Sequence, residues 1–158
     1  MERVLVGFLL LFLQACANAY PDLSGTHYRL DDVSLTIAQA RSVTESLQNE
    51  ISSKTGLSIN PVEVFTGTPT FPTAIHAVLN DDNGCEVSIT IYSDEHVQSD
   101  HHSIFLEARG DIGKLFHINK GNPAREKELA EISRKAIEGV FPGHLMINWH
   151  PKSGLLGP

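Results

Sequence analysis

Long apolar runs are scarce in this sequence of 158 residues, and the longest lies close to its start. Residues 4–13, VLVGFLLLFL, form a run of about ten residues. As a helix this run would span about 15 Å, which is half of the ~30 Å hydrocarbon core of a bilayer. The sequence therefore predicts no transmembrane helix.

Residues 1–19 instead have the layout of a secretory signal peptide, with a weakly charged start, the apolar run and a small polar end. Two processing sites overlap at that end. Ala17-Asn18-Ala19 is an A-x-A site that would release a chain beginning at Tyr20. Leu13-Gln14-Ala15-Cys16 resembles the bacterial lipobox, in which the cysteine is lipidated. We expect an exported protein, either a bacterial envelope lipoprotein anchored at Cys16, which we favour, or a periplasmic or secreted protein.

Cysteine is also scarce, with Cys16 and Cys85 as the two in the chain. Processing would remove or acylate Cys16, so the two thiols cannot form a disulfide with each other. Cys85 falls on the apolar phase of a predicted strand, where a thiol behaves as a small hydrophobic side chain. The sequence therefore predicts a packing role for Cys85, with an intermolecular disulfide or a nucleophile as the alternatives.

Basic residues are outnumbered, 12 against 19 acidic residues, for a net charge of −7. Removal of residues 1–19 takes one acid and one base, so this balance is kept. An acidic chain argues against nucleic acid and against adhesion to anionic lipid. We expect membrane contact only through a lipid anchor at Cys16, and we expect a protein partner.

Catalytic motifs are absent from the sequence. It has no G-x-S-x-G, P-loop, dinucleotide fingerprint or H-E-x-x-H, and nothing fixes two carboxylates at the separation that glycosidases need. We therefore favour a role without catalysis. A hydrolase with a histidine and carboxylate site is the third alternative.

The most informative stretch that is present is residues 74–93, which reads as a β-hairpin with a loop ending in Asn83-Gly84. Its second arm alternates strictly between apolar and polar side chains. The apolar phase comprises Cys85, Val87, Ile89 and Ile91, and the polar phase comprises Glu86, Ser88, Thr90 and Tyr92. This pattern predicts a sheet with one buried face and one open face.

Two helices flank the predicted strands. Thr36 and Gln39 can form a capping box, an apolar period follows, and Gly56 suits the C-terminal end. Asn122 and Pro123 are typical of an N-cap followed by the first helical residue. The second helix should end near residues 139–142.

Four further segments complete the predicted fold. Residues 57–65 suggest a strand, in which Pro61 indicates an edge strand or a bulge. Residues 103–109 suggest a strand, residues 114–119 its partner, and residues 145–149 a short last strand or an apolar strap. The fold class predicted is an α+β two-layer sandwich, with an antiparallel sheet of four to five strands and two helices on one face. The single domain covers residues 34–150, after a flexible leader at 20–33 and before a tail at 151–158.

A histidine-rich loop, SDEHVQSDHHS at residues 93–103, is the sharpest cluster of chemically active side chains. Imidazole and carboxylate groups together suit a transition metal such as zinc. The candidate ligands are His96, Asp100, His101 and His102. A solvated loop that binds no metal is the competing interpretation.

Two more histidines fall on polar strand phases, His76 in the hairpin and His117 in the segment 114–119. If their strands were neighbours, they would form a proton-transfer or metal pair. The alternative is that they are polar-face residues without a shared role.

The leading hypothesis is an exported protein-binding or accessory domain, a class that includes inhibitor and immunity-type proteins. The alternative is an exported transition-metal-binding protein that uses residues 94–102. The two hypotheses predict different effects of chelation, because a protein-binding domain should keep its partner when metal is removed.

Overall fold

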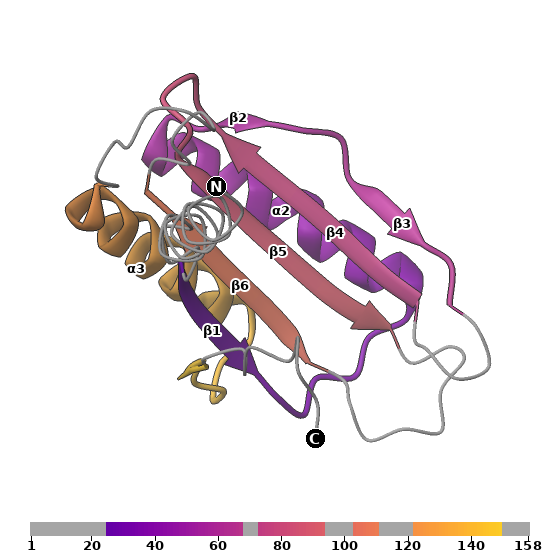
Figure 1. The fold of residues 1–158 in the computed structure, drawn as a ribbon. Helices are drawn as coiled ribbons and strands as arrows, with labels where there is room; N and C mark the ends of the chain where they lie inside the picture. Colours follow the sequence, from indigo (N-terminus) through magenta and orange to yellow (C-terminus); the bar gives the residue numbers. More distant parts are fainter. Residues whose placement is uncertain (1–24, 68–72, 94–102, 111–121, 150–158) are drawn as a thin grey trace, which may run out of the picture.

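The computed structural model describes residues 25–67, 73–93, 103–110 and 122–149 (Figure 1). Four predictions concern other residues and lie outside this described part. They are the signal peptide with Cys16, the strand at 114–119, the metal loop at 94–102 and the tail at 151–158.

The described residues form a two-layer α+β sandwich, so the predicted fold class is confirmed. The sheet is antiparallel, in the order β2-β4-β5-β6-β1-β7, and β3 pairs with the same strand as β2. Its strands are β1 (Thr26–Leu30), β2 (Ser58–Ile59), β3 (Glu63–Phe65), β4 (Thr73–Asn80), β5 (Glu86–Ser93), β6 (Ile104–Arg109) and β7 (Ile147–Asn148). The described residues contain seven strands, more than the predicted four to five, although the predicted strand at 114–119 lies outside them. The leader supplies β1, the edge segment divides into β2 and β3, and the last segment forms β7.

Both helices begin where their caps predict. In α2 (Ile37–Thr55), the Thr36 hydroxyl accepts from the backbone N–H of Gln39 at 3.3 Å, and the Gln39 side chain accepts from the backbone N–H of Thr36 at 2.9 Å. This is the capping box, and Gly56 ends the helix with φ 76°. In α3 (Pro123–Val140), the Asn122 side chain accepts from the backbone N–H of Arg125 at 3.0 Å.

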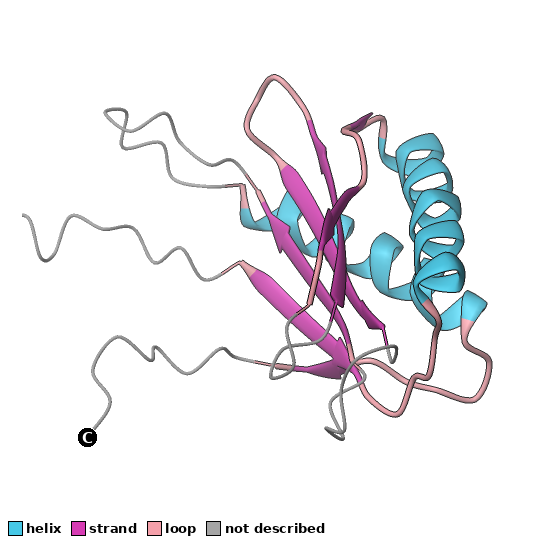
Figure 2. Ribbon diagram, turned by 90° about the vertical axis from the view of Figure 1, so that its right-hand side faces the viewer, coloured by secondary structure: helices cyan, strands magenta, loops and turns pink. Residues whose placement is uncertain are grey.

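The two helices cover one face of the sheet (Figure 2). Their apolar stripes and the inward side chains of the strands form one core. Its fully buried members include Leu47, Ile51, Ile75, Ile89, Leu106, Leu129 and Ile137. Cys85 is 5% exposed and belongs to the same core, so its predicted packing role is confirmed.

The flexible leader predicted over residues 20–33 is wrong for residues 25–33. Five of these residues form β1, which lies inside the sheet between β6 and β7. Gly25 lies so close to β6 that an added Cβ would sit 2.5 Å from the backbone oxygen of Ala108. The strand was not predicted because its residues do not alternate between apolar and polar side chains. Polar Thr26 points to the core side, and His27, on the open side, is largely buried.

Of the two alternatives for residues 57–65, an edge strand or a bulge, the structure shows the edge position. The segment pairs with β4 twice, as β2 and as β3, on either side of that proline. The break is anchored from two sides: the backbone N–H of Asn60 donates to Val78 at 3.1 Å, and the side chain of Gln48 donates to the Asn60 carbonyl at 2.9 Å. The last segment, left open between strand and strap, forms the short edge strand β7.

Candidate functional site: the open face of the sheet

The sheet face opposite the helices, here called the open face, is covered by no described helix (Figure 2). The strand registers assign its side chains, because partners opposite one another point to the same side. The open face carries Glu63, Phe65, His76, Val78, Asn80, Glu86, Ser88, Thr90, Tyr92, Phe105, Glu107, Arg109, His27, Arg29, Ile147 and Trp149.

Three aromatic rings meet on the open face, from Tyr92 on β5, Phe105 on β6 and Trp149, which follows β7 on the far side of β1. The Tyr92 and Phe105 ring centroids are 5.7 Å apart with planes at 87°, and those of Phe105 and Trp149 are 5.1 Å apart at 67°. Trp149 also meets His27 edge-on, with centroids 6.2 Å apart. Edge-to-face contacts at such distances are favourable because the ring edge is positive and the ring face negative.

A shallow hollow of about 280 Å³ opens beside these rings, here called the aromatic concavity. The three aromatic side chains supply apolar walls, while hydroxyls and a carboxylate supply hydrogen-bonding groups. Its lining is His27, Ser88, Thr90, Tyr92, Phe105, Leu106, Glu107 and Trp149.

A second hollow, of about 360 Å³, lies over β3 and β4 and is here called the Glu63 concavity. Its lining is Asn60, Pro61, Glu63, His76 and Val78. Glu63 is exposed and lies opposite His76 in the strand register. The ring of Phe65 approaches His76 with a centroid distance of 6.2 Å.

A hydrogen-bonded pair separates the two hollows. Nδ1 of His76, which lines the Glu63 concavity, is 2.9 Å from Oγ1 of Thr90, which lines the aromatic concavity. The two residues are direct partners across β4 and β5. The hollows are therefore adjacent parts of one surface, joined by a polar ridge.

Charge on the open face is unbalanced toward negative. Arg109 is paired with Glu107, and Arg29 is paired with Asp31 at 2.8 Å. Glu63 and Glu86 form no ion pair with any side chain in the described part of the chain. Glu86 lies opposite Arg109 in the strand register, whereas Glu63 lies opposite His76. Among the described side chains, Glu63 is therefore the glutamate of this face that lacks both an ion pair and an arginine opposite it, and it would attract a basic group.

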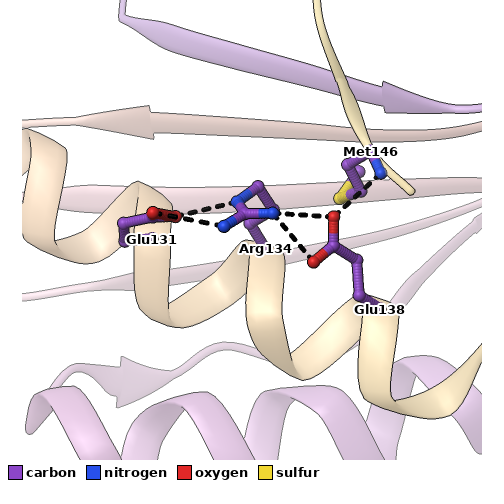
Figure 3. A network of polar contacts seen from close by, with 4 residues as sticks. All are labelled: Glu131, Arg134, Glu138 and Met146. Carbon is purple, nitrogen blue, oxygen red and sulfur yellow. Dashed lines mark hydrogen bonds and ion pairs between the residues drawn. The ribbon is translucent and has the colours of Figure 1, made fainter.

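A polar network on α3 holds the segment that carries Trp149 (Figure 3). Arg134 bonds to Glu131 and to Glu138, each at 2.8 Å, and Glu138 accepts the backbone N–H of Met146 at 3.0 Å. Arg134 also lies over the ring of Tyr28 in β1, 6.0 Å from its centroid. The network thus ties α3 to both β1 and the residue before β7.

The hydrogen bonds of this network shift the pKa values of its members. The bond to Glu131, followed by the bond to Glu138, raises the pKa of Arg134 above its ordinary value. The bond from Arg134 lowers the pKa of Glu131. Both shifts favour the charged forms. Beyond the network, β7, which adjoins Met146, is also held by the bond that the backbone N–H of Trp149 donates to the backbone carbonyl of His27, at 3.0 Å.

Of the side chains predicted to carry chemistry, His76 lies on the open face as expected and bonds to Thr90. His117 lies outside the described residues, so the histidine pair stays a prediction. His96, Asp100, His101 and His102 also lie outside them. Within the described residues, no group of three or more histidine, cysteine, aspartate and glutamate side chains is placed to hold a metal ion.

The aromatic residues of the site were not singled out from the sequence. Tyr92 and Phe105 each fall on the polar phase of their strand. A large ring on that phase could have indicated an aromatic surface on the open face. Trp149 carried no comparable signal, because its place depends on the pairing of β7 with β1.

Comparison of the chain with protein-family models, curated proteins and solved structures found no match. In the described ranges, neither helix is both long enough and apolar enough to cross a membrane.

Proposed function

We propose that this chain is an exported protein-binding module whose open face is the binding surface. The observation that carries the proposal is the aromatic concavity on a sheet face that no described helix covers. Tyrosine, tryptophan and phenylalanine are enriched in protein interfaces because they bring a large contact area with few rotatable bonds. Inhibitor and immunity-type roles belong to this class.

The open form of the aromatic concavity favours a side chain of a partner over a whole small molecule. Sites for small molecules usually have about 300–1,000 Å³ and enclose most of the ligand. The aromatic concavity has about 280 Å³ and is open. It therefore suits one anchoring side chain of a larger partner.

Export and anchoring form the second part of the proposal. The support is the order of residues 1–19, with the apolar run before the small polar end, and the lipobox-like residues ending at Cys16. Acylation of Cys16 would hold the domain on a membrane, since each buried methylene contributes about 0.8 kcal/mol.

The test is affinity purification from envelope extract with the full chain and with Phe105→Ala. We expect a specific partner to bind the full chain at least about ten times more tightly than the variant, because the anchor loses its central ring. Lys135→Ala, an exposed substitution on α3, is the control and should bind as the full chain does. Equal binding by all three proteins would exclude the open face as the binding surface.

Repeating the purification with a chelator distinguishes binding by the open face from the metal-binding hypothesis. A partner that binds through the open face should be retained. Loss of the partner on chelation, together with metal in the purified chain, would favour the site at residues 94–102 instead.

A further inference from the structure

The two concavities are connected by one straight row of side chains. Glu63, His76, Thr90 and Phe105 are successive register partners on β3, β4, β5 and β6. Phe105 lines the aromatic concavity and Glu63 lines the other. A ligand that occupies both hollows must therefore cross the strands along this row and pass over the His76–Thr90 ridge.

The Glu63 concavity has the chemistry of a site for a long basic side chain. Its carboxylate is exposed and has no ion-pair partner among the described side chains. Pro61 and Val78 give it apolar walls. Lysine and arginine combine an aliphatic stem with a charged end, and so can contact both parts at once.

The separation of the two hollows sets the spacing of the ligand groups. Neighbouring strands lie about 4.8 Å apart, so Phe105 and Glu63, three strand intervals apart, are separated by about 14 Å. An extended chain advances about 3.3 Å per residue, and about four residues cover that distance. The ridge between them offers polar side chains to the backbone of the intervening residues.

On these grounds we infer that the open face binds an extended peptide segment of a partner, with an apolar side chain in the aromatic concavity and a lysine or arginine about four residues away in the Glu63 concavity. This inference rests on the proposed function, because it names the ligand of the same surface. A second copy of this chain fits less well, because the arginines of its own open face, Arg29 and Arg109, are already paired with Asp31 and Glu107.

The test uses the full chain, in which Trp149 is the single tryptophan and lies in the aromatic concavity. The probes are ten-residue glycine–serine peptides that carry one leucine and one lysine, spaced by four positions or by two, in both orders. A third set replaces the lysine by glutamate. Titration is followed by the emission of Trp149.

The peptides with a spacing of four should bind about ten times more tightly than those with a spacing of two, and the glutamate set should bind least. Glu63→Gln should remove the preference for lysine. Glu86→Gln is the matched control, because it makes the same change of charge on the same face but lines neither hollow. It should leave the preference intact.

Three results would overturn the inference: no peptide binding, binding without preference for lysine or for spacing, or equal effects of the Glu63 and Glu86 variants. None of these results would contradict the proposed function, which is tested separately by the binding of the Phe105→Ala variant to the envelope partner. Partner binding that survives Phe105→Ala would reject the proposed function even if the peptides bind.

Discussion

At the scale of single residues, Gln48 shows how one polar group shapes the edge of the sheet. It lies on the core side of α2, is 2% exposed, and donates to the carbonyl of Asn60 just before the break at Pro61. The bond holds the segment between β2 and β3 against the helix. It therefore supports one wall of the Glu63 concavity, which Asn60 and Pro61 line.

Gln48→Glu should destabilise the fold by about 2 kcal/mol or more at pH 7, because it directs a buried carboxylate at a carbonyl oxygen. Burial raises the pKa of the new carboxyl in the folded state above its unfolded value. The protonated form can donate again, so stability should return as the pH falls toward about 4. Urea unfolding at several pH values measures this. Asn49→Asp on the exposed side is the control, and an equal loss in both variants would contradict the role of Gln48.

Two glycines provide an opposed pair of substitutions. A Cβ at Gly25 would lie 2.5 Å from the Ala108 oxygen, whereas a Cβ at Gly139 would meet nothing within 4 Å. Gly25→Ala should cost about 1–3 kcal/mol, because the backbone of β6 must move. Gly139→Ala should stabilise by about 0.5–1 kcal/mol through helix propensity. Thermal unfolding compares the two, and a stable Gly25→Ala variant would argue against the close approach of residue 25 to β6.

At the scale of elements, the position of β7 depends on α3. β7 contributes two residues to the sheet, both exposed, so its own burial holds it weakly. Met146, which precedes it, is 6% exposed and bonded to Glu138. The helix therefore helps to position Trp149, together with the pairing of β7 with β1 and the backbone bond from Trp149 to His27, although Trp149 is on the opposite face of the sheet.

Glu138→Ala should displace β7 and expose Trp149, because it removes the acceptor of the Met146 N–H and one partner of Arg134. The expected result is a red shift of tryptophan emission without loss of the helices. Glu128→Ala removes a carboxylate of the same helix that bonds to Arg125 and does not contact Met146, so its emission should stay unchanged. Identical spectra for both variants would show that Arg134 and Glu138 do not position β7.

The elements that the sequence predicted well are those with local signals. The capping residues Thr36 and Asn122, Gly56 and the alternation of residues 85–92 each act over a few positions, and each is found where it was expected. Pro61 likewise interrupted its strand, because proline has no N–H to donate to a ladder.

At the scale of the whole molecule, the parts that escaped prediction depend on contacts between distant residues. Thr26 pairs with Ala108, and Tyr28 pairs with Asn148. Without those pairings, the polar residues near the start of the domain read as a leader. The aromatic concavity had no local signature for the same reason, since its rings come from β5, β6 and the end of β7.

The central claim is that the partner binds on the open face, and Trp149 reports on it directly as the single tryptophan of the chain. The decisive measurement is the emission of Trp149 in the full chain while the partner from the envelope extract is added. The partner is prepared without tryptophan, so that it contributes no tryptophan emission of its own. A saturable blue shift is predicted, because the partner excludes water from the aromatic concavity. Saturable binding with unchanged Trp149 emission would contradict the account.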